Sequence, residues 1–148
     1  MMNVSELGSV ASLHHAYLVV GDAEWGKKAT LAMLEARGIE TRGNPDVFVL
    51  SFVDLLVDDV RDSMLPFAAL KPLGARKYLV VSFSRANDSS QNALLKAVEE
   101  SLGRTTFFFS VDAAGHMLPT LRSRCITVSA GEGGKGDVEK SDEAESFL

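Results

Sequence analysis

The chain has 148 residues, of which 46% are hydrophobic and 24% charged, as in an ordinary globular domain. No apolar run approaches the ~20 residues of a membrane span, so we expect a cytoplasmic protein. Its single cysteine, Cys125, excludes an intramolecular disulfide and a multi-cysteine zinc site. Of the net charge of −5, residues 130–148 carry −4. The nearly neutral remainder does not favour a protein that grips nucleic acid by itself.

Apolar periodicity predicts helices that alternate with strands along the chain. In chain order the pattern predicts a short helix over 3–13, a strand over 16–20, a helix over 29–36, a strand over 46–50, a helix over 57–70, a strand over 77–83, a helix over 91–101 and strands over 105–111 and 125–129. This alternation indicates an α/β fold, with a parallel sheet of about five strands covered on both sides. We expect one three-layer P-loop NTPase domain over residues 1–129. Residues 130–148 are expected to form an acidic, solvated tail.

A phosphate-binding loop is indicated by the spacing Gly-x4-Gly-Lys at Gly21, Gly26 and Lys27. The motif follows an apolar strand and precedes a helical pattern, and a phosphate loop needs that context. The next residue should be Ser or Thr, to bind Mg²⁺ through its hydroxyl, but Lys28 stands there and an ammonium cannot bind a metal ion. Alternatively, the segment is only a tight strand-to-helix turn with Lys27 in water. ATP or ADP binding stays open, and we expect no metal site.

Phosphoryl transfer also needs a carboxylate at the end of a central strand. The strand over 77–83 should supply it, but its end reads Val81-Ser-Phe-Ser-Arg85. This second loss is independent of the first. Because such catalysis consists mostly of positioning and charge stabilisation, the two losses together predict no intrinsic ATPase activity.

Three further motifs carry a family resemblance: His15-Ala-Tyr-Leu, Asn92-Ala-Leu-Leu-Lys96 followed by Glu99-Glu100, and Thr120-Leu-Arg-Ser-Arg-Cys125. In order and spacing they resemble the clamp-loader ATPases of bacterial DNA polymerase III, which are AAA+ proteins, and most closely the delta prime type. The resemblance extends over roughly residues 14–129.

The resemblance implies that Arg124 is an arginine finger. A guanidinium is planar and permanently charged, so it can neutralise charge that develops on a γ-phosphate. A chain without its own metal and water-activating groups could still offer that arginine to a neighbour. The resemblance also implies an interface that includes Arg122, Ser123, Asn92 and Lys96. Without the family motif, the arginines would be read as surface residues paired with carboxylates.

The implied protein is a non-hydrolysing clamp-loader subunit that requires no cofactor. Its expected partners are the motor subunits, a delta-type subunit and the sliding clamp, with DNA reached only through the complex and no membrane contact. The chain departs from the family in three ways. Residues 36–45 lack the four zinc-binding cysteines of many relatives, Val111 replaces the usual Thr or Asn, and an acidic tail stands where a lid and a collar domain follow in relatives.

Two alternatives stay open. One is an active or nucleotide-binding P-loop ATPase whose metal ion is held indirectly. The other is a truncated interaction module that works outside a clamp loader.

Overall fold

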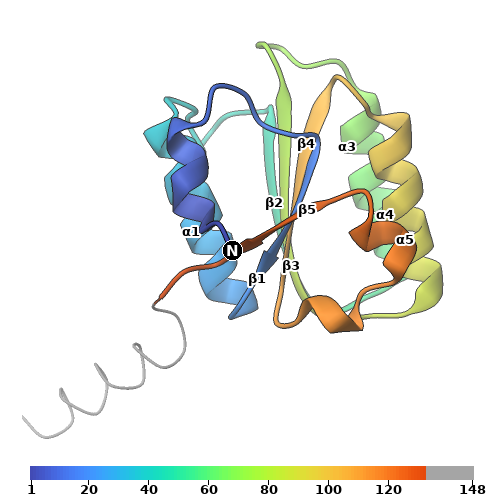
Figure 1. The fold of residues 1–148 in the computed structure, drawn as a ribbon. Helices are drawn as coiled ribbons and strands as arrows, with labels where there is room; N and C mark the ends of the chain where they lie inside the picture. Colours follow the sequence, from blue (N-terminus) through green and yellow to red (C-terminus); the bar gives the residue numbers. More distant parts are fainter. Residues whose placement is uncertain (133–148) are drawn as a thin grey trace, which may run out of the picture.

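The computed structural model describes residues 1–132 as five strands with helices on both sides (Figure 1). The strands are β1 Ala16–Val20, β2 Val47–Leu55, β3 Lys77–Ala86, β4 Thr105–Val111 and β5 Ile126–Ser129. The helices are η1 Val4–Ser9, α1 Ala23–Ala36, α2 Val57–Asp59, η2 Val60–Met64, α3 Leu65–Ala69, α4 Asp88–Glu100, η3 Ala114–His116 and α5 Pro119–Arg122. Among these residues no helix has the length and hydropathy needed to cross a bilayer.

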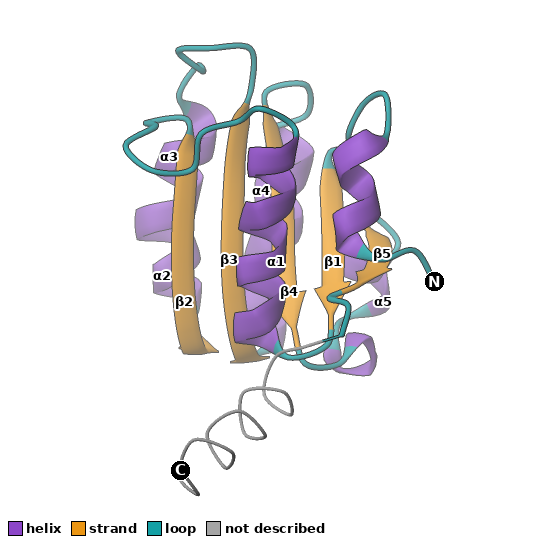
Figure 2. Cartoon of the chain, turned by 90° about the vertical axis from the view of Figure 1, so that its left-hand side faces the viewer, coloured by secondary structure: helices purple, strands orange, loops and turns teal. Residues whose placement is uncertain are grey.

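All strands are parallel and lie in the order β2-β3-β4-β1-β5 (Figure 2). Helices η1 and α1 cover one face, and α2 to α5 cover the other (Figure 1). Strand β4 lies at the centre and every one of its residues is buried. This burial explains its nearly continuous apolar sequence, which is typical of parallel strands covered on both faces. The predicted three-layer α/β domain with five parallel strands is confirmed.

The sheet separates two hydrophobic cores, and the three phenylalanines of β4 contribute to both. Phe107 and Phe109 point toward α4, whereas Phe108 points toward α1 and stacks on Tyr17, with 5.3 Å between ring centroids. All three are fully buried and form part of the core.

The structure differs from the predicted boundaries in several places. Strand β2 continues to Leu55 because it pairs with β3 along nearly its whole length. The predicted helix over 57–70 is one continuous helical segment whose middle, Val60–Met64, has π-helical hydrogen bonds. The N-terminal helix is a single 3₁₀ helix, Val4–Ser9.

The domain extends beyond the predicted boundary at residue 129. Ala130 is buried, and its N–H donates to the carbonyl of Val20 at 2.8 Å. It therefore belongs to the sheet and not to a solvated tail. The rest of the predicted acidic tail, residues 133–148, lies outside the described residues.

Because all strands run the same way, the sheet has one edge of carboxyl ends and one edge of amino ends. The carboxyl ends of the strands and the segments after them carry the carboxylates Asp22, Glu24, Asp54, Asp58, Asp59 and Asp112 and the cations Lys27, Lys28 and Arg85. The segments that precede or enter the amino ends carry the cations Arg37, Arg76, Lys77, Arg104, Arg122 and Arg124 and the carboxylates Glu40 and Asp46. Ligands of open α/β sheets bind at the carboxyl edge, which in this protein carries more carboxylates than cations.

Candidate functional site

The segment expected to form a phosphate-binding loop is mostly helical. Helix α1 begins at Ala23, six residues before the predicted start, so Gly26 and Lys27 lie inside it. Only Gly21 and Asp22 separate the helix from β1. The chain therefore passes from strand to helix through a tight turn in place of the predicted loop, as in the alternative interpretation of the motif. Lys27, however, is not left in water as that alternative expected, because it is paired with Glu24 and Ser51.

The amide groups at the start of α1 donate to acceptors of the protein itself. The carboxylate of Asp22 accepts from the N–H of Trp25 at 2.8 Å, and that of Asp112 accepts from the N–H of Ala23 at 3.0 Å. The N–H of Gly21 donates to the carbonyl of Val111 at 3.1 Å. Free N–H groups and the positive end of the helix dipole make a helix start bind phosphate. At α1 two carboxylates take that role, so a phosphate would meet negative charge and fewer donors.

Gly26 is required by packing. A Cβ atom at this position would lie 2.2 Å from Oγ of Ser110 and 3.2 Å from Cγ1 of Val19. The Ser110 hydroxyl also donates to the carbonyl of Ala23 at 2.6 Å. Helix α1 therefore packs directly on β1 and β4.

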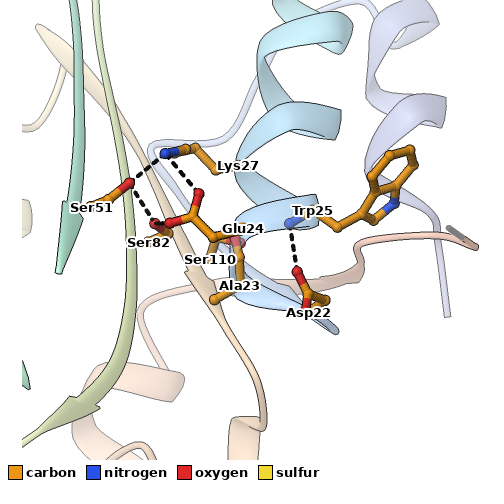
Figure 3. A network of polar contacts seen from close by, with 8 residues as sticks. All are labelled: Asp22, Ala23, Glu24, Trp25, Lys27, Ser51, Ser82 and Ser110. Carbon is orange, nitrogen blue, oxygen red and sulfur yellow. Dashed lines mark hydrogen bonds and ion pairs between the residues drawn. The ribbon is translucent and has the colours of Figure 1, made fainter. Parts of the chain in front are cut away.

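Lys27 does not point toward the start of its helix. Its ammonium forms an ion pair with Glu24 at 2.8 Å and donates to the hydroxyl of Ser51 on β2 (Figure 3). The hydroxyl of Ser82 on β3 donates to Glu24 at 3.2 Å. The hydrogen bond from Lys27 is the main cause that lowers the pKa of Glu24; burial opposes it, and the serine hydroxyls add to the lowering.

Three serines form a row beneath the first turns of α1. Ser51, Ser82 and Ser110 are direct neighbours across β2, β3 and β4. Sequence reasoning did not identify them, although each follows two apolar residues in its strand: Val-Leu-Ser, Val-Val-Ser and Phe-Phe-Ser. This shared pattern was the available signal. The row and the Glu24–Lys27 pair attach α1 to the half of the sheet that lies away from β1.

The carboxyl end of β3 carries Arg85 where an ATPase would have a carboxylate. Its guanidinium makes two hydrogen bonds to Asp54 on β2, at 2.6 and 3.0 Å. Asp54, the carboxylate at the end of the neighbouring strand, is thus already paired with a cation. Lys28, in the position of the magnesium-binding hydroxyl, is exposed. Residues 1–132 contain no group of three potential metal-binding His, Cys, Asp or Glu side chains.

Arg124 lies at the opposite edge of the sheet. It follows α5 and precedes β5, and both Arg122 and Arg124 are exposed. Within residues 1–132 neither guanidinium forms an ion pair. Ile126, two residues after Arg124, pairs with Tyr17 on β1, and the four residues from Tyr17 to Gly21 span about 13 Å at ~3.3 Å per residue, so Arg124 lies still farther from Gly21. Arg124 therefore cannot reach the start of its own α1.

The other predicted interface residues lie on α4 and beside α5. Asn92 and Lys96 are exposed on α4, one turn apart, with Lys96 3.9 Å from Glu100. Ser123 is exposed and its hydroxyl donates to the carbonyl of Thr120 at 2.8 Å. Helices α4 and α5 pack on the same face of the sheet (Figure 1).

Gln91, which the sequence interpretation passed over, connects these two helices. Its buried amide accepts from the N–H of Leu118 at 2.6 Å and donates to the carbonyls of Ala86 and His116 at 2.9 and 3.3 Å. Leu118 is the N-cap residue that directly precedes α5. The amide therefore fixes the start of the helix that leads to Ser123 and Arg124.

Cys125 begins the return into the sheet after Arg124. Burial raises the pKa of its thiol to about 12. The side chain packs against the core on the α4 face, as a small hydrophobic residue does.

Strand order, layers and the position of α1 define an AAA+ type α/β domain. A solved structure of a DNA polymerase III gamma subunit-related protein from Thermotoga maritima has the same fold, with a TM-score of 0.72 over 95% of this chain and 49% of that one. Its sequence identity of 22% supports a shared fold alone.

The family follows from the sequence comparisons. The family model described as DNA polymerase III, delta subunit, matches residues 34–131, and the chain belongs to this family. It is 32% identical over 146 residues to DNA polymerase III subunit delta' of Pseudomonas aeruginosa, covering 82% of this chain and 44% of that protein. The delta' subunit of Haemophilus influenzae is 29% identical over 134 residues, covering 76% and 41%. The predicted resemblance to delta prime subunits is confirmed, and the chain spans less than half the length of these relatives.

Replacement of Gly26 by alanine tests whether this glycine serves packing. We expect Gly26→Ala to lower the free energy of unfolding by about 1–3 kcal/mol, because the new methyl group displaces the Ser110 hydroxyl. Urea titration followed by circular dichroism measures the change. Gly115→Ala is the matched control, since a Cβ there meets no atom within 4 Å. Equal stability of the two variants would contradict the packing role.

The pH dependence of stability tests the Glu24–Lys27 pair. Because the folded pKa of Glu24 lies below its ordinary 4.5, the ionised side chain stabilises the fold fully above that value. Glu24→Gln should therefore be less stable than wild type near neutral pH. The difference should shrink as pH falls below 4.5 and vanish once Glu24 is protonated in the folded state too. Urea titrations across this range would contradict the pair if the difference stayed constant.

Proposed function

We propose that this chain acts as a non-hydrolysing, delta-prime-like subunit of a DNA polymerase III clamp loader. In that role it supports loading of the sliding clamp in DNA replication and offers Arg124 to the ATP site of a neighbouring motor subunit. The observation that carries the proposal is the contrast between the two edges of the sheet. At the carboxyl edge the amides of α1 are occupied by Asp22 and Asp112, whereas at the amino edge Arg124 is exposed.

The charges at the carboxyl edge argue against a resident nucleotide. A triphosphate with its magnesium ion needs free amides, a lysine and an oxygen ligand for the metal. Lys27 is paired with Glu24 and Ser51, and the strand-end carboxylate Asp54 is paired with Arg85. Two of the first amides of α1, Lys27 and the strand-end carboxylate therefore already have protein partners. The proposed subunit therefore requires no cofactor.

The position of Arg124 suits action on another chain. Its charge is permanent, it faces solvent, and its main chain is held by a hydrogen bond from its N–H to the carbonyl of Leu121 at 3.0 Å. A neighbour that presents its carboxyl edge to this amino edge would bring its triphosphate to the guanidinium. Arg122, exposed two residues before Arg124, adds a second cation that favours the approach of such an anionic site.

The family membership supports the choice of partners. The curated relatives are subunits of DNA polymerase III, so the proposed neighbours are clamp-loader motor subunits and a delta-type subunit. The exposed residues Arg122, Ser123, Asn92 and Lys96 belong to the proposed interface. The assembled loader would act on the sliding clamp, and this chain would contact DNA only through the complex.

The first test is nucleotide binding and turnover by the purified chain. We expect no magnesium-dependent ATP hydrolysis above background and no thermal stabilisation by ATP, because the amides that would bind phosphate are occupied. Phosphate release and differential scanning fluorimetry make these measurements. Turnover that Lys27→Ala abolishes would contradict the proposal and favour an active ATPase.

The second test replaces the proposed finger. In a mixture with the cognate motor subunit, Arg124→Ala should lower ATP turnover at least about tenfold while leaving co-elution of the two chains unchanged, since the guanidinium stabilises charge only in the transition state. Arg61→Ala, which removes another exposed arginine on η2, is the matched control. Unchanged turnover with Arg124→Ala would refute the finger. Failure of the wild-type chains to co-elute would favour an interaction module outside the clamp loader.

A further inference from the structure

Two adjoining cavities lie at the amino edge of the sheet, where α1 ends and the chain enters β2 and β3. Their volumes are about 320 and 490 Å³, and Ala75, Arg76 and Tyr78 line both. We call the two together the entry groove. Its smaller cavity is also lined by Arg37, and its larger cavity by Ile39, Glu40, Pro45 and Asp46. The entry groove therefore has arginines in its smaller part and carboxylates in its larger part.

Arg37 is fixed in the smaller cavity by neutral acceptors. It directly follows α1, and its Nη1 donates to the carbonyls of Leu7 and Val10, both at 2.8 Å. These carbonyls lie at the end of η1, which packs on α1. The two hydrogen bonds hold the guanidinium in place and leave its charge without a counter-charge.

Arg76 adds a second guanidinium to the same cavity. Its Nε donates to Oγ1 of Thr106 at 2.5 Å, and its Nη1 donates to the carbonyl of Gly103 at 3.4 Å. Within residues 1–132 neither Arg37 nor Arg76 forms an ion pair. Two half-buried guanidinium groups that line one cavity favour an anionic ligand, because their charge is permanent and their geometry matches a carboxylate.

The larger cavity has the opposite charge. Asp46 accepts from the N–H groups of Leu73 and Gly74 at 2.9 and 2.7 Å. These hydrogen bonds lower the pKa of Asp46; burial opposes them, and the charge of Lys77 adds to the lowering. Asp46 thus already has protein partners. Glu40 is exposed and forms no ion pair in the described part of the chain, so it is the carboxylate available to a ligand.

The wall between the two charged ends is apolar and fixed. Ile39 and Tyr78 pack against the core on the α1 face. The loop before β2 is held by Asn44, whose Nδ2 donates to the carbonyl of Glu40 at 2.9 Å and whose Oδ1 accepts from the N–H of Asp46 at 3.0 Å. A preformed apolar wall with a few well-placed polar groups is typical of small-molecule sites.

We propose that the entry groove binds a small zwitterionic molecule, with its carboxylate at Arg37 and Arg76 and its ammonium group at Glu40. The apolar chain between the two charges lies along Tyr78. A polyanion such as ATP suits the groove less well, because its further negative charges would meet the carboxylates of the larger cavity. This site goes beyond the proposed clamp-loader function, which uses none of these residues.

Three unbranched probes of similar length separate the charges. ε-Aminocaproate carries a carboxylate and an ammonium group, adipate carries two carboxylates, and hexamethylenediamine carries two ammonium groups. Each is titrated into the whole chain at neutral pH and constant ionic strength. The amide NMR signals of groove residues such as Gly43 and Gly74 report binding. A capped peptide with one glutamate and one lysine tests whether the same charges are recognised on a peptide instead.

We expect wild type to bind ε-aminocaproate at least about threefold more tightly than either of the other probes, because only this probe matches both ends of the groove. Arg76→Gln should weaken its binding at least about tenfold, since charge-assisted hydrogen bonds are lost. Arg61→Gln, which removes an exposed arginine on η2, is the matched control and should bind as wild type does.

The charge at the other end is tested by reversing it. Glu40→Lys should reverse the order of the probes, so that adipate binds more tightly than ε-aminocaproate. Glu99→Lys makes the same change of charge at an exposed position on α4, across the sheet, and should keep the order of wild type. Because the side chain of Glu40 is exposed, this test stays valid if Arg76→Gln fails to fold. Circular dichroism of each variant verifies folding.

Other outcomes overturn the inference in distinguishable ways. Equal affinity for the three probes, or unchanged binding by Arg76→Gln, would refute the site. A wild-type preference for adipate, or an order that Glu40→Lys leaves unchanged, would refute the ammonium end. Binding of the capped peptide without binding of ε-aminocaproate would refute the small-molecule ligand. None of these results bears on Arg124, so the proposed function stands or falls by its own tests.

Discussion

The occupied start of α1 is the constraint on which the rest of the molecule depends. A helix start leaves several N–H groups without partners, and these must be satisfied by side chains, water or a ligand. Here Asp22 and Asp112 satisfy two of them, and Gly26 lets the helix rest on Ser110 and Val19. The carboxylates also suit the positive end of the helix dipole. The helix start and the glycine that would bind a triphosphate in a phosphate loop here hold α1 on the sheet.

The parallel sheet then determines what the chain can do. Parallel strands collect their carboxyl ends at one edge and their amino ends at the other, so groups on the two edges act on different neighbours. Asp22 and Asp112 lie at one edge and Arg124 at the other. In the proposed function, a single sheet would therefore suffice to separate the degenerate phosphate motif from an arginine that acts on a neighbour.

The sequence predicts the layers well and the site less well. The five strands are recoverable because strands such as β4 are buried on both faces and are almost wholly apolar. The start of α1 was mispredicted because the spacing of Gly21, Gly26 and Lys27 was given more weight than Asp22, a good capping residue that directly precedes the helix.

Two contacts of the site could not be predicted from the local sequence. The serine row depends on strand register, and the partner of Gln91 is a loop 27 residues away. The periodicity of a single segment predicts neither the alignment of the serines across strands nor the hydrogen bond of Gln91 to Leu118. Arg124 is exposed. From periodicity alone it would be read as an ordinary surface residue, and only the family motif marks it as a candidate functional residue.

An internal cap also changes how stability is coupled to nucleotide. A domain whose helix start is satisfied only by phosphate gains stability when ATP binds and loses it on release, by mass action. In this chain the acceptors are covalently part of the protein, so the first turn of α1 is satisfied at every nucleotide concentration. In the role proposed for Arg124, the sheet formed by β1 and β5 would then keep one arrangement while a neighbour passes through its ATP cycle. A guanidinium that serves another chain's transition state needs this constancy, because every conformation in which it points elsewhere reduces the fraction of productive encounters.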